Sequence, residues 1–127
     1  MIRPHVVQHL IQIGRSGDPD DPTTAAHLDA IAKYSSINRK HWKDWNEITD
    51  PMPTHDVVAL TKGLVLAELR HRWIGGSVAA AIWTFREVES RDTLVADELA
   101  DWILPRTRNS YLPYGSNNHG TSSAKEY

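Results

Sequence analysis

The sequence predicts an all-α protein, a compact bundle of five to six helices with an irregular C-terminal strap. Apolar residues recur with the 3.6-residue period of a helix in several successive segments. Clusters of proline, glycine, aspartate and asparagine separate these segments. A chain of 127 residues, 40% apolar and 24% charged, has the size and composition of one globular domain. We expect a helical bundle domain over residues 1–105 and the strap over residues 106–127.

The first two predicted helices cover residues 4–15 and 22–34. In the first, the apolar residues gather on one side, and Pro4 suits the first turn. Asp21 followed by Pro22 is typical of an N-cap and a first helical residue. The turn residues between the two segments therefore separate two helices.

A short third helix is predicted over residues 39–48. Asn38 is expected to cap it, and Trp42 and Trp45 lie on its apolar face, which favours burial of both side chains. Two prolines follow Asp50 and end the helix, because proline donates no backbone hydrogen bond.

The strongest helical signal begins at Thr54, which is expected to act as the cap. Apolar residues surround most of this helix, so we expect it to be buried at the centre of the bundle. Gly75 and Gly76 end it, and Ser77 is expected to cap a further helix through Val88. These glycines and the alanines after them permit a close approach of helix backbones.

A last helix is predicted over residues 92–104, and Pro105 stops it. Its apolar side includes Leu94 and Trp102. We expect Trp102 and Trp83 to be buried, so that replacing either with alanine costs about 3–5 kcal/mol.

The composition excludes several classes of protein. A net charge of −2 provides no overall field for DNA or RNA, so a nucleic-acid contact requires a local basic patch. The absence of cysteine excludes disulfides, thiolate nucleophiles and zinc sites with cysteine ligands. No apolar run approaches the ~20 residues of a membrane span. We expect a cytoplasmic protein with no membrane partner.

Two patterns are candidates for metal binding. His5 and His9 are four residues apart, so both project from one helix face, as metal-chelating pairs do. Glu68 and His71 form a Glu-x-x-His pattern, which helix bundles use twice to hold two iron or manganese ions. Only one copy is present here. Solvated histidines and an ordinary pair of Glu68 with Arg72 are the simpler interpretation, and we expect no cofactor.

A candidate anion site lies where the central helix ends and the next one is expected to begin. Arginines stand there beside glycines, and the start of a helix offers unpaired backbone amides. Glycine pairs between helices also serve simply as turns. The candidate residues are Arg70, Arg72, Trp73, Gly75, Gly76 and Ser77.

The strap carries a second group of candidate binding residues. It mixes cations, tyrosines, amides and a histidine in irregular backbone, as recognition surfaces do. The alternative is a strap that packs its tyrosines on the bundle without a binding role. The candidates are Arg106, Arg108, Tyr111, Tyr114, Asn117 and His119.

No catalytic constellation stands out, because no serine lies in a nucleophile-elbow pattern and cysteine is absent. We therefore expect a non-catalytic interaction module, a small subunit or adaptor that binds another protein or associates with itself. One alternative is an accessory subunit that contacts nucleic acid or a nucleotide through the arginines and tyrosines named above. Another is a metal-dependent helical-bundle enzyme that uses Glu68 and His71.

Overall fold

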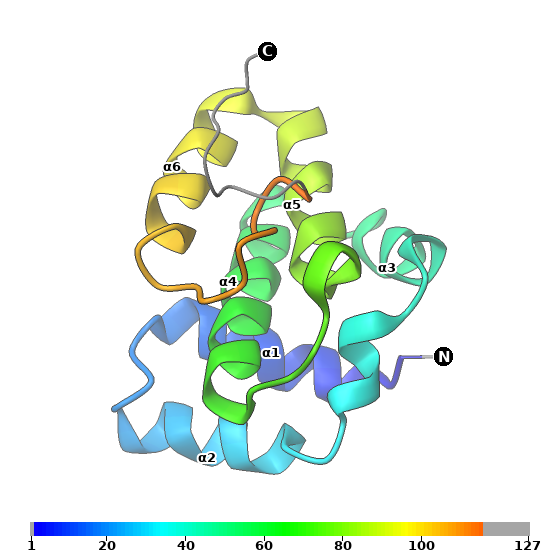
Figure 1. Cartoon of the computed structure of the whole chain (residues 1–127). Coiled ribbons are helices and arrows are strands. Elements are labelled where there is room, and N and C mark those ends of the chain that lie inside the picture. Colours follow the sequence, from blue (N-terminus) through cyan, green and yellow to red (C-terminus); the bar gives the residue numbers. More distant parts are fainter. Residues whose placement is uncertain (1, 116–127) are drawn as a thin grey trace.

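The computed structural model describes residues 2–115, and this part of the chain forms six α-helices and two short 3-10 turns, with no strand (Figure 1). The predicted all-α fold is confirmed. In chain order the elements are α1 (Pro4–Ser16), α2 (Pro22–Ile31), η1 (Ser35–Arg39), α3 (Trp42–Thr49), α4 (Thr54–His71), η2 (Gly76–Val78), α5 (Ala80–Arg91) and α6 (Thr93–Ile103).

The helix α4 runs through the middle of the bundle, with α1 crossing it on one side and α5 packed along another (Figure 1). Next to these, α2 lies beside α1, while α3 and α6 pack on α5. Inside, Thr61 of α4 donates a hydrogen bond of 2.8 Å to the Thr84 hydroxyl of α5 and stays fully buried. The predicted burial of the central helix is confirmed.

The crossing of α1 and α4 depends on one glycine from each helix. A Cβ atom built on Gly14 would lie 1.7 Å from the Ala59 carbonyl oxygen. One built on Gly63 would lie 1.9 Å from the Leu10 carbonyl oxygen. These two glycines therefore allow the backbones of α1 and α4 to approach closely.

Some helix ends follow their local sequence signals and others do not. Asp21 accepts hydrogen bonds from the amides of Thr23 and Thr24, so the predicted cap of α2 is confirmed. The helix ends at Ile31, earlier than expected, because turns occupy the next residues. The expected Thr54 cap was wrong, since Pro53 precedes α4 without a side-chain cap.

The expected roles of Asn38 and Ser77 as caps were both wrong. The helix α3 begins at Trp42, and its cap is His41, whose Nδ1 accepts a hydrogen bond from the Lys43 amide. Asn38 instead lies in η1, is buried, and accepts a hydrogen bond from the amide of Ala80 at the start of α5. Ser77 lies in η2, because α5 starts three residues later than its position.

Several large apolar residues are less buried than their helical positions predicted. Trp45 is fully buried, but Trp42 is 43% exposed and Leu94 is 75% exposed. Trp83 and Trp102, expected in the core, are only partly buried against it. A position on an apolar stripe thus does not ensure that another element covers it.

The described part of the strap, residues 106–115, packs on the bundle. Leu112 is fully buried, Tyr111 is partly buried, and Tyr114 places its ring edge-on against Phe85 at 5.4 Å between centroids. Asn117 and His119 lie outside the described residues. Within residues 2–115, no helix is both long enough and apolar enough to cross a membrane.

Candidate functional site

A cavity of about 530 Å³ lies between the end of α4, the turn after it and the strap. We call it the strap pocket. It brings together residues from both groups of candidates that the sequence indicated, although these groups are far apart in the chain. Its lining residues are Glu68, Leu69, Arg72, Trp73, Ile74, Gly75, Gly76, Arg108, Asn109, Ser110 and Tyr111.

A carboxyl group, that of Glu68, forms a buried part of this pocket. The Glu68 residue is 8% exposed. The side-chain amide of Asn38 donates to its Oε2 at 2.9 Å, and that of Asn109 donates to the same atom at 3.3 Å. No other described residue bonds this carboxyl group. Its Oε1 atom therefore has no hydrogen-bond partner among the described residues.

The environment of Glu68 shifts its pKa upward. Burial raises the pKa of Glu68, because removing a carboxylate from water disfavours the charge. The amide hydrogen bonds from Asn38 and Asn109 lower the pKa and so oppose this effect, but burial is the larger cause. The pocket thus contains a carboxyl group whose pKa is set by burial and by two amide hydrogen bonds.

The four candidate arginines divide into two pairs. The Arg70 guanidinium donates to the Pro19 carbonyl oxygen at 3.5 Å. The Arg106 guanidinium donates to the Trp102 carbonyl oxygen at 2.7 Å and lies 4.3 Å from the centroid of that indole ring. These two arginines have structural partners and do not line the strap pocket.

Arg72 and Arg108 have no such partners and both line the pocket. Their side chains are exposed and form no hydrogen bond or ion pair with any residue that the structure describes. Arg72 ends α4 in the left-handed conformation, with φ of 55°, so its side chain leaves the helical path there. Two cationic side chains from distant segments are therefore available at one cavity.

The helix start expected beside the anion site lies at Ala80 and not at Ser77. The Ala80 amide at the start of α5 already donates to the Asn38 side chain at 3.2 Å. Gly75 is required for close packing, since a Cβ atom there would lie 2.7 Å from Asn38 Nδ2. Gly76 has φ of 54° and accepts a hydrogen bond from Asn109 through its carbonyl oxygen. Ser77 does not line the pocket.

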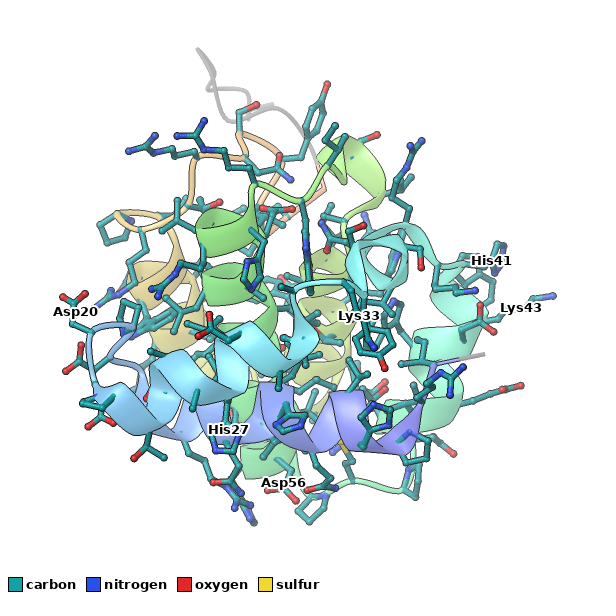
Figure 2. All side chains as sticks on the ribbon, turned by 90° about the horizontal axis from the view of Figure 1, so that it is seen from below. Asp20, His27, Lys33, His41, Lys43 and Asp56 are labelled. Atoms are coloured by element: carbon teal, nitrogen blue, oxygen red, sulfur yellow. The ribbon has the colours of Figure 1, made fainter. Side chains whose placement is uncertain are left out.

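The candidate metal ligands form no common cluster: the rings of His5 and His9 lie 6.3 Å apart on α1, whereas Glu68 and His71 lie near the end of α4. His5 bonds the Tyr34 hydroxyl at 3.3 Å, while His71 bonds the Leu28 carbonyl oxygen at 2.8 Å. His9 meets His27 at 2.8 Å between their Nδ1 atoms. Figure 2 shows α1 and α2 side by side, with the labelled His27 at their boundary. Residues 2–115 contain no group of three or more potential ligands arranged to hold a metal ion.

The pair of His9 and His27 has its own electrostatic consequence. Burial lowers the pKa of His9, and the neighbouring His27 and His5 lower it further. A neutral pair can share one hydrogen bond between the two rings, whereas two protonated rings repel each other. The pair therefore favours packing of α2 on α1 when it is uncharged.

A second cavity, of about 480 Å³, was not indicated by the sequence. Its charged side chains already have partners: Arg86 lies 5.0 Å from the centroid of the Trp83 ring, and Glu87 pairs with Arg91 at 2.7 Å. Its lining residues are Trp42, Asn46, Trp83, Arg86, Glu87 and Ser90.

The polar centre of the strap pocket was also missed by sequence reasoning. Asn38 lies in η1 and Asn109 in the strap, and no local pattern shows that both amides reach Glu68. Tyr114, a predicted candidate, does not line the pocket, whereas Tyr111 does. Comparison of the chain with protein-family models, with curated protein sequences and with solved structures finds no match.

Proposed function

We propose that the protein is a non-catalytic interaction module that binds another protein through the strap pocket and its rim. The observation that supports this proposal most directly is the meeting of Arg72 and Arg108, neither of which has a partner within residues 2–115, at one cavity with Trp73 and Tyr111. Arginine, tryptophan and tyrosine are the residue types that most often dominate binding energy at protein interfaces.

The rim of the pocket supports the same proposal. Ile74 is 77% exposed, and Val78 on the neighbouring 3-10 turn is 43% exposed. Apolar side chains beside a partly polar cavity form the mixture found at protein interfaces. A partner that covers Ile74 removes that side chain from water, which favours association.

The lining of the pocket favours binding over catalysis. Glu68 is the one acidic residue among the lining residues, whereas glycoside hydrolysis usually requires two carboxyl groups across a bond. Ser110 lines the pocket without a histidine there to act as its base. The proposal therefore assigns recognition, and no reaction, to this cavity.

A nucleotide-type ligand is the second candidate function. Arg72, Arg108 and Tyr111 favour it, because guanidinium groups bind phosphate and aromatic rings stack on bases. Against it, the amide of Ala80 at the nearby helix start is already occupied by Asn38. The salt dependence of binding distinguishes the two functions. Affinity that depends on phosphate contacts falls steeply as the salt concentration rises, whereas the affinity of an interface with an apolar contribution falls less.

The test is capture of partners from a cell extract by the wild-type chain and two matched variants. Ile74→Asp places a charge at the pocket rim, and Leu94→Asp does the same at an equally exposed apolar residue of α6. We expect a partner protein that the wild type and Leu94→Asp both retain and Ile74→Asp loses. Equal capture by all three chains contradicts the proposal.

A further inference from the structure

We propose that the strap pocket recognises an acidic side chain of the partner, an aspartate or glutamate next to an apolar residue, held between Arg72 and Arg108. This inference rests on the proposed function and specifies the chemistry of the partner. The carboxylate belongs to a side chain within the partner segment and not to its C-terminus, so the segment continues past the pocket.

The two arginines of the pocket are suited to bind a carboxylate. A guanidinium group presents a planar fork of donors that matches the two oxygens of a carboxylate. Arg72 and Arg108 come from two segments that line the cavity, the end of α4 and the strap, and both are exposed without a described partner. A carboxylate that enters the pocket can therefore accept hydrogen bonds from cations of both segments.

Glu68 does not neutralise these cations. It forms no ion pair within 4.0 Å with either arginine, and its Oε2 atom is bonded by amides instead. Burial raises the pKa of Glu68, so the group takes up a proton more readily when a second carboxylate approaches. A protonated Glu68 can then donate a hydrogen bond to the ligand from the unbonded Oε1 position.

The strap holds Arg108 in place. Its neighbour Asn109 donates to Glu68 at 3.3 Å and to the Gly76 carbonyl oxygen at 3.1 Å. The Asn109 side-chain oxygen also accepts the Tyr111 amide at 2.9 Å. The wall that carries Arg108 is thereby tied to the wall that carries Arg72. This arrangement reduces the ordering that binding requires.

The exposed residues beyond the arginines identify the source of the carboxylate. Ile74 and Val78 extend the surface past the cavity and remain exposed. A segment that contributes an apolar side chain to them and a carboxylate to the pocket accounts for both features. A free phosphate would use neither apolar residue, and the helix-start amide of Ala80 is already occupied.

The experiment selects ligands from a phage-displayed library of random dodecapeptides on the immobilised full chain. We expect the selected peptides to share an aspartate or glutamate beside an apolar residue. Synthetic versions are then titrated by fluorescence polarisation. Replacing the shared acid with its amide, or making Arg72→Gln or Arg108→Gln, should each weaken binding roughly 10-fold or more, because hydrogen bonds to charged groups are lost. Arg39→Gln, at an exposed arginine outside the pocket, should leave affinity unchanged.

A second variant tests the sign of the charge on the ligand. Glu68→Gln retains an oxygen for the Asn38 and Asn109 amides but cannot become negative, so affinity should be unchanged or higher. Weaker binding by this variant, with an unchanged circular dichroism melt, would show that the ligand donates to Glu68 and would overturn the proposal.

Three further results would overturn it. One is a set of selected peptides without a shared acid, and another is no peptide whose binding depends on Arg72 and Arg108. The third is loss of binding when only the peptide's terminal carboxylate is removed. If partner capture still depends on Ile74 in any of these cases, the proposed function stands and only the acidic ligand is wrong.

Discussion

The side-chain amide of Asn109 lies 3.3 Å from Oε2 of Glu68, and this contact joins the strap to the central helix α4. The same nitrogen atom lies 3.1 Å from the Gly76 carbonyl oxygen. One amide group of the strap is therefore bonded to both α4 and η2 at the strap pocket. Asn109 therefore contributes both to the stability of the fold and to the shape of the candidate site.

Replacing Asn109 with alanine should lower the free energy of unfolding by about 1–3 kcal/mol, because partly buried groups lose their hydrogen-bond partner. Urea denaturation followed by circular dichroism measures the change. The control is Asn46→Ala, whose exposed side chain forms no hydrogen bond with the described residues. Equal stability of the two variants would contradict the role of Asn109.

Adding one methyl group at Gly63 should destabilise the fold severely. The new Cβ atom would lie 1.9 Å from the Leu10 carbonyl oxygen, so α1 and α4 must separate. We expect Gly63→Ala to cost more than about 3 kcal/mol, the upper part of the range for overpacking. Gly76→Ala is the control, since nothing lies within 4 Å of its Cβ position. There, the cost should be limited to about 1–2 kcal/mol of strain at positive φ. Thermal denaturation of both variants tests the difference.

The charge of Glu68 should make part of the stability depend on pH. Burial raises its pKa in the folded protein above the ordinary value of 4.5. The folded state then binds the proton more tightly than the unfolded state, so this contribution is fully present below 4.5 and is lost as pH rises through the raised pKa. The Glu68→Gln variant lacks this loss.

Wild-type stability should therefore fall relative to that of Glu68→Gln as the pH rises from 4.5. Urea denaturation of both proteins at a series of pH values between 4 and 8 measures the difference. Glu47→Gln, at an exposed position, controls for the general effect of removing one acidic group. Parallel pH profiles of the wild type and Glu68→Gln would show that burial does not affect this carboxyl group.

Two tryptophans three residues apart should respond very differently to replacement by alanine. Trp45 is fully buried, so Trp45→Ala should cost about 3–5 kcal/mol. Trp42 is 43% exposed. Its replacement should cost below about 1 kcal/mol, as at most surface positions. Chemical denaturation tests both, and similar losses would place Trp42 in the core after all.

The sequence by itself determined the fold class and several helix boundaries. The pair Gly75 and Gly76 was expected to end α4, but the helix ends at His71, with Arg72 in the left-handed conformation as its cap. Asp21 with Pro22 and the prolines after Asp50 act on backbone groups within a few residues of themselves. Such signals do not depend on the rest of the fold, so they can be interpreted one segment at a time. The buried centre of α4 was predictable for a related reason, since its apolar residues surround most of the helix.

Only the tertiary structure decided which side chains meet. Asn38 is a plausible cap for the helix that follows it, but packing places it against Glu68 and Ala80 instead. The same packing brings Arg72 and Arg108 to one cavity. Arg70 and Arg106, from the same two segments, do not line it. Helical periodicity gives the side of a helix on which a residue lies, but it does not give the neighbour that covers that side. The site depends on contacts between distant segments, and these are set when η1, α4, the start of α5 and the strap pack together.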